Sequence, residues 1–123
     1  MAIGGRDYGA AGHRIVLMHP NKGLVIDLAA VRALPAARGV TRFRAACQNT
    51  YAGDPKNAGL VCEFWVFVDG EQRFSRAPMR GTDGGFDIDV ELRPTDRYLT
   101  LVAADGGDDF VTDWLTLGDP RLE

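Results

Sequence analysis

The sequence predicts an all-β fold, specifically a β-sandwich of the jelly-roll type. Apolar and polar residues alternate along eight short stretches, which is the pattern of half-buried strands. Clusters of Gly, Pro, Asn and Asp separate these stretches. Short strands with turns at intervals of about 8–12 residues are typical of sandwiches and jelly rolls. With 123 residues the chain has the length of one domain, so we expect residues 1–123 to form a single sandwich.

The expected strands, in chain order, are Arg14–Met18, Leu24–Leu28, Val40–Cys47, Leu60–Val68, Gln72–Arg76, Phe86–Leu92, Tyr98–Ala103 and Phe110–Leu117. The Asp69-Gly70 pair lies between two of them and is the strongest signal in the chain for a tight hairpin. One helical turn is expected over Ala29–Leu34, with Asp27 near its start and Pro35 at its end.

Alternation along the longer strands also predicts which side chains enter the core. One face carries Cys62, Phe64, Val66 and Val68, and the matching face of the preceding strand carries Phe43, Ala45 and Cys47. The opposite face carries Trp65 and Phe67. Two interpretations of these rings remain open. A loop or helical turn covers them, or they form an exposed aromatic surface for a protein partner or a homodimer.

The two cysteines are too few for a disulfide scaffold or a cysteine-based zinc site. Cys47 and Cys62 lie symmetrically about Asp54 and Pro55. In a hairpin they would oppose each other on antiparallel strands, within reach of a disulfide. The alternative is two buried thiols that act as small apolar side chains.

Composition and charge exclude several classes of protein. The hydrophobic fraction of 46% and the charged fraction of 25% are those of a soluble globular protein. No apolar stretch is long enough for a membrane helix, and residues 1–12 carry no secretory signal. Residues 1–62 hold 8 basic and 3 acidic side chains, whereas residues 63–123 hold 6 and 14. Within one sandwich the arginines would lie near these aspartates, which disfavours nucleic-acid binding.

Enzymatic motifs are not found. His13 or His19 with a cysteine could make a nucleophilic pair, but both cysteines fall on expected core faces, where thiols are inert. The N-terminal glycines do not have the spacing of a dinucleotide-binding loop. We therefore expect a protein without catalytic activity.

Several segments, in order along essentially the whole chain, resemble the NPCBM family of carbohydrate-binding modules, also classed as carbohydrate-binding module family 51. They are Ile3-Gly4-Gly5-Arg6-Asp7-Tyr8, residues 15–21, 24–28, 42–45 and 64–70, then 99–102, 105–108, Asp113-Trp114 and 118–122. The resemblance implies a galactose-binding-like jelly roll with no activity of its own. It also implies a bacterial module of a longer secreted or surface protein, binding galactose-type or related glycans outside the cell.

The chain departs from the family in three respects. One is a long insertion, Arg32–Gly39, together with the loop Gln48–Ala58, both of which would reshape the site. Family members usually begin further upstream, so either the first strand of the fold is missing or the chain is a trimmed piece. The closing motif of the family usually reads Asp-His-Ala-Asp-Trp, where this chain has residues 110–114 as Phe-Val-Thr-Asp-Trp. Loss of that polar pair leaves a second interpretation open, in which the same fold serves protein–protein contact and no longer binds sugar.

Loops at one end of a sandwich are the natural place for a sugar site, which needs an aromatic ring and a few hydrogen-bonding groups. The candidates for carbohydrate contact are His19, Asn21, Asn49, Tyr51, Asp105 and Asp108. Tyr51 is the best candidate for stacking on the sugar. The alternative for each Asn and Asp is an ordinary turn, in which the side chain caps its own backbone.

The run that contains Asp105, Asp108 and Asp109 has the oxygens and glycines of a calcium loop. It is not an EF-hand, because the twelfth position is Thr116 instead of Glu. A solvated turn is the alternative, and no other cofactor is expected. For Asp113 and Trp114 we expect structural roles, with Trp114 in the core.

Overall fold

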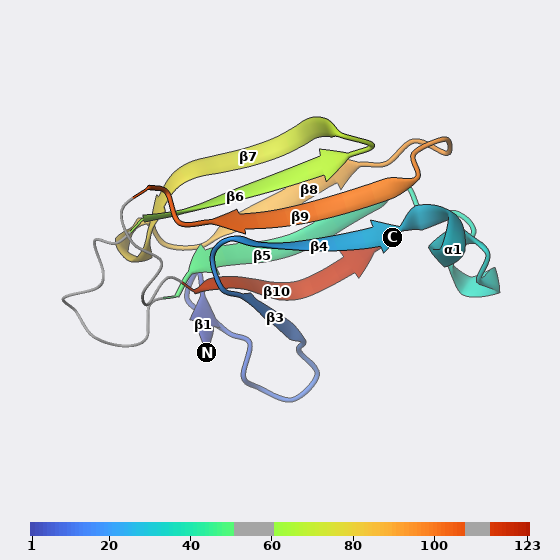
Figure 1. Ribbon diagram of the computed structural model, residues 1–123. Helices are drawn as coiled ribbons and strands as arrows, with labels where there is room; N and C mark the ends of the chain where they lie inside the picture. Colours follow the sequence, from blue (N-terminus) through green and yellow to red (C-terminus); the bar gives the residue numbers. More distant parts are fainter. Residues whose placement is uncertain (51–60, 108–113) are drawn as a thin grey trace.

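The chain folds into two four-stranded antiparallel sheets that pack face to face (Figure 1). A short hairpin at the N-terminus adds two strands of two residues each. This computed structural model describes residues 1–50, 61–107 and 114–123. The strand order is β3-β10-β5-β8 in one sheet, called here the β5 sheet, and β4-β9-β6-β7 in the other, called the β6 sheet. The expected all-β sandwich is thereby confirmed.

The strands are β1 (Ala2–Ile3), β2 (Arg6–Asp7), β3 (Ile15–Met18), β4 (Lys22–Asp27), β5 (Arg42–Asn49), β6 (Val61–Val68), β7 (Glu71–Arg80), β8 (Phe86–Glu91), β9 (Tyr98–Ala104) and β10 (Leu115–Leu122). The helical elements are α1 (Leu28–Arg32) and the 3-10 turns η1 (Pro35–Ala37) and η3 (Gly81–Asp83). From β3 onward, successive strands alternate between the two sheets, except at the β6–β7 hairpin.

Several expected strand boundaries differ from the observed ones, and two strands extend past a proline that was expected to lie outside them. The last strand runs to Leu122 instead of ending at Leu117, and it passes Pro120 at an irregularity between Gly118 and Arg121. Strand β7 continues past Pro78 to Arg80. It lies at the edge of its sheet, where an N–H that faces solvent takes no part in strand pairing, so a proline without an N–H is tolerated. The N-terminal hairpin β1–β2 was not expected.

Local turn chemistry formed as expected at two places. Asp69 and Gly70 connect β6 and β7 with φ of 50° and 82°, as a two-residue hairpin of type I′ requires. Helix α1 is one residue earlier than expected at its start, and Asp27 caps it by accepting the N–H groups of Ala29 and Ala30.

The core consists of the inner faces of both sheets, and all seven residues that the strand alternation predicted for it are buried. Of the two alternatives for Cys47 and Cys62, the buried thiols are confirmed and the hairpin is wrong. Strands β5 and β6 belong to different sheets, so the two residues enter the core from opposite sides as buried thiols. Burial raises the pKa of the Cys47 thiol well above its usual value, and the neighbouring Cys62 adds to this effect.

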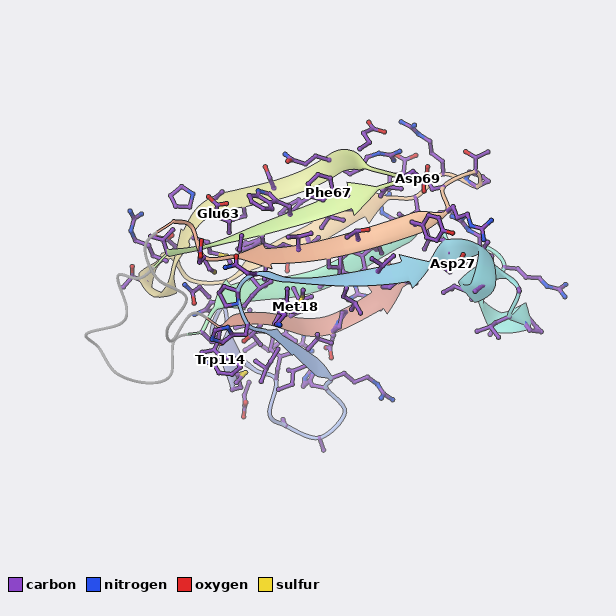
Figure 2. The ribbon with its side chains drawn as sticks, in the orientation of Figure 1. Met18, Asp27, Glu63, Phe67, Asp69 and Trp114 are labelled. Carbon is purple, nitrogen blue, oxygen red and sulfur yellow. The ribbon has the colours of Figure 1, made fainter. Side chains whose placement is uncertain are left out.

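Trp65 and Phe67 lie on the outer face of the β6 sheet and are half-buried. Figure 2 shows Phe67 projecting from that face, away from the β5 sheet. Figure 1 shows α1 beyond the end of β4, so this helix does not cover the two rings. Their cross-strand neighbours on β9 are Val102 and Thr100.

Opposite charges from the two halves of the chain meet on the β5 sheet, as expected. Arg42 and Arg44 of β5 pair with Asp89 of β8 at 2.7 and 2.9 Å, and Arg44 also pairs with Glu123 at 2.8 Å. These arginines are therefore neutralised locally. Among the described residues, no helix has the length and apolar character needed to cross a membrane.

Candidate functional site

The ends of several strands from both sheets lie at one end of the sandwich, which we call the loop end. Leu115, at the start of β10, lies opposite both Met18, at the end of β3, and Asn49, at the end of β5. In the other sheet, the start of β4 lies opposite Ala103, next to the end of β9. The loops that leave these strands therefore emerge close together on a rigid frame.

Two aromatic rings meet at the loop end. The imidazole of His19 and the indole of Trp114 have centroids 5.1 Å apart and planes at 86°, an edge-to-face contact. Both side chains are half-buried, and Figure 2 shows Trp114 at the same end of the sandwich as Met18. Thr50 holds the backbone here, because its N–H and its hydroxyl both donate to the Trp114 carbonyl, at 2.7 and 3.1 Å.

A polar pair lies between the turns on the β6-sheet side of the loop end. The amide of Asn21, which has φ of 60°, donates to one carboxylate oxygen of Asp105 at 3.0 Å. The other oxygen accepts the Gly107 N–H at 3.0 Å. The hydrogen bond from Asn21, followed by that from Gly107, lowers the pKa of Asp105, so this carboxyl stays ionised and accepts hydrogen bonds at neutral pH.

The structure brings three of the six predicted contact residues together at the loop end: His19, Asn21 and Asp105. Asn49 is at the same end but is 1% exposed, and its amide donates to the Met79 carbonyl at 3.2 Å between the two sheets. A ligand on the surface would not reach it. The predictions for Tyr51 and Asp108 concern residues outside the described part of the chain.

The calcium prediction rests on Asp105, Asp108 and Asp109, of which only Asp105 lies within the described residues. Within residues 1–50, 61–107 and 114–123, no group of three or more His, Cys, Asp or Glu side chains could hold a metal ion. The carboxylate of Asp105 is already hydrogen-bonded through both oxygens. Calcium binding therefore stays a prediction for the acidic run.

Sequence reasoning did not identify Trp114 as a site residue. It was expected in the core because the last strand was expected to span residues 110–117, which would have placed Trp114 in the middle of that strand. It lies instead directly before β10 and is half-buried at the loop end. The sequence held no clear signal for this position, because Gly118 and Pro120 are both uncommon inside a central strand and argued for an earlier end of the strand.

An antiparallel jelly roll with aromatic and polar side chains in its end loops is the architecture of a binding module. Comparison with protein families gives the particular family. The model of the NPCBM/NEW2 domain matches residues 6–123, and the chain belongs to this family. A comparison with curated protein sequences finds no match.

Solved structures share the fold. The CBM51 from Clostridium perfringens GH95, determined in complex with methyl-galactose, matches with a TM-score of 0.71 and 22% identity, over 89% of this chain and 70% of that chain. A structure of ZmpB from the same organism contains an M60 catalytic domain with two CBM51 domains. It matches with a TM-score of 0.73 and 26% identity, over 89% of this chain and 10% of that one. The ZmpB CBM51-2, in complex with GlcNAc, gives a TM-score of 0.72 and 17% identity, over 89% of this chain and 21% of that one.

Proposed function

We propose that this chain is a non-catalytic carbohydrate-binding module that recognises galactose-type or related glycans at its loop end. The observation that carries the proposal is the convergence of His19, Asn21, Asp105 and Trp114 from three separate segments onto one end of the sandwich. The solved CBM51 structures in complex with methyl-galactose and with GlcNAc support a sugar as the ligand.

The chemistry of the loop end suits a monosaccharide. A pyranose presents a C–H face that packs on an aromatic ring and a rim of hydroxyls that both donate and accept hydrogen bonds. Trp114 and Tyr51 supply the rings in this proposal, and His19 supplies a ring nitrogen. Asn21 and the ionised Asp105 supply a planar donor and acceptor that already hold each other in position.

The proposal extends to the setting of the module. The ZmpB match covers a tenth of a chain that also holds a catalytic domain, which supports a role as one module within a larger enzyme. The solved CBM51 structures come from proteins of the bacterium Clostridium perfringens, and they support an extracellular or cell-surface setting. We therefore place the parent protein in the extracellular space or on the cell surface.

Tryptophan fluorescence tests the site directly. In a Trp65→Phe background, Trp114 is the single tryptophan of the chain and reports on the loop end. We expect methyl-galactose or GlcNAc at millimolar concentration to change its emission in a saturable manner. His19→Ala and Tyr51→Ala should each weaken the affinity by about tenfold, the effect of losing roughly 1.4 kcal/mol of contact.

Gln72→Ala, which removes an exposed amide on β7, is the control and should leave the affinity unchanged. The same titration with calcium and with a chelator tests the metal, and we expect no difference because Asp105 is satisfied within the protein. Loss of affinity in chelator would instead assign calcium to the acidic run. Unaltered affinity in both His19→Ala and Tyr51→Ala would contradict the site. If no sugar changes the emission and the protein is a dimer, the outer face that carries Trp65 and Phe67 is favoured as a protein interface.

A further inference from the structure

A second polar hollow lies on the outer face of the β5 sheet, away from the loop end. Two adjoining cavities of 210 and 290 Å³ share the residues Arg6, Tyr8, Ala46 and Asp87. The N-terminal segment forms one wall, and Figure 1 shows β1 on the side of β10 and β5 that faces away from β4. Strands β5, β8 and β10 form the floor, through residues such as Ala46, Asp87 and Gly118.

Glycines, which have no side chain, let the N-terminal segment lie directly on the β5 sheet. A Cβ at Gly118 would come within 2.6 Å of the Tyr8 ring, and a Cβ at Gly85 would come within 2.4 Å of the Gly4 nitrogen. The Gly4 N–H also donates to the Gln48 side chain at 3.0 Å. Close packing against the β5 sheet therefore fixes the position of the N-terminal wall of the hollow.

Two charged groups in the hollow are available to a ligand. The Arg6 guanidinium lies over the Tyr8 ring, 5.5 Å from its centroid, which orients its N–H donors. Within the described residues, neither Arg6 nor Asp87 makes an ion pair or a side-chain hydrogen bond. By contrast, Asp119 accepts hydrogen bonds from His13 and from the Arg14 N–H.

The charge balance selects the class of ligand. Arg6 and Arg121 are matched by Asp87 and Asp119, so the hollow favours neither an anion nor a cation. A guanidinium offers only donors and a carboxylate only acceptors, and neighbouring hydroxyls of a sugar use both kinds of group at once. The volumes fall below the roughly 300 Å³ at which pockets for drug-sized ligands begin, which suits one sugar residue.

We propose a second saccharide site in this hollow, in which Arg6 donates to and Asp87 accepts from adjacent hydroxyls of one uncharged sugar residue. Ala46, which is half-buried on the outer face of β5, lines the same hollow and faces the C–H groups of the sugar. The site adds to the function proposed for the loop end and does not depend on it. A module with both sites holds two points of a branched or repeating glycan at once.

Backbone amide NMR separates the two sites. The probes are methyl-galactose and GlcNAc, each titrated to saturating millimolar concentration into ¹⁵N-labelled protein. We expect one of these sugars to shift the amides of Gly85 and Gly118 in the natural sequence and equally in His19→Ala. Asp87→Asn and Arg6→Ala should each weaken that response by about tenfold or more, since each removes a charged hydrogen-bonding partner.

Two matched controls keep the test specific. Glu91→Gln alters another exposed carboxylate on the same strand as Asp87, and Arg38→Ala removes an exposed arginine distant in sequence. Both should leave the response at Gly85 and Gly118 unchanged.

The proposal is overturned if neither sugar shifts these amides, if the shifts persist unchanged in Asp87→Asn, or if they vanish in His19→Ala. Shifts at Gly118 with silent amides at Asn21 and Gly106 would support this site and contradict the loop end instead.

Discussion

Aspartate side chains do much of the anchoring in this molecule. Asp27, Asp69 and Asp119 each accept one or two backbone N–H groups from a neighbouring turn or strand. These bonds lower the pKa of each carboxyl, with the backbone N–H as the largest cause in all three. Asp69 and Asp119 belong to the acidic half of the chain, so part of the charge of that half holds the connections of the sandwich in place.

Asp69 gives a prediction for pH dependence. The Tyr98 and Arg97 N–H groups lower its pKa in the folded state, so its contribution to stability is complete above the unfolded-state pKa of about 3.9. That contribution is lost as the pH falls through the lower, folded-state pKa. We expect the urea midpoint to fall between about pH 5 and pH 2, and to fall less in Asp69→Asn. The same acid loss in both proteins would contradict this role.

At the scale of elements, the β6–β7 hairpin depends on a glycine. Gly70 has φ of 82°, a conformation that an alanine adopts only with strain. We expect Gly70→Ala to lower the free energy of unfolding by about 1 kcal/mol, measured by urea denaturation. Gly39→Ala is the control, because no atom lies within 4 Å of its added Cβ and its φ is not positive. Equal effects in the two variants would show that the turn conformation is not the cause.

Elements built from local chemistry could be predicted from the sequence, and those set by pairing could not. Asp69-Gly70 and the Asp27 cap act within a few residues, and both formed as expected. The length of strand β10 depends on its partners instead. It lies between β3 and β5, and pairing with β5 resumes beyond Gly118 and Pro120. The hairpin alternative for Cys47 and Cys62 is wrong for the same reason, since the choice of sheet is a long-range property.

The candidate site divides in the same way. Residue types suitable for a sugar are visible in the sequence, and His19, Asn21 and Asp105 do meet at the loop end. The burial of Asn49 and the exposure of Trp114 follow from strand boundaries that the pattern misplaced. The hollow around Arg6 and Asp87 exists only because the N-terminal segment folds back on the β5 sheet.

At the scale of the whole molecule, the two thiols report on the integrity of the core. Cys47 and Cys62 are 0% exposed, and burial raises the pKa of Cys47, so the reactive thiolate is scarce in the folded state. We expect an aromatic disulfide reagent at neutral pH to label both thiols only as fast as the sandwich opens. The labelling rate should rise with urea in parallel with unfolding. Rapid labelling of either thiol in native protein would contradict this arrangement.

Strand β10 is the last strand along the chain, yet it occupies an interior position between β3 and β5. A ribosome makes this strand last, so the β5 sheet cannot close while the module is still being synthesised. Among the described strands, β3 pairs with β10 alone, and Leu17 of β3 lies opposite Thr116 of β10. Pairing over such sequence separation is slow. The β5 sheet therefore closes only after β10 has been synthesised, whereas the β6–β7 hairpin can pair much earlier.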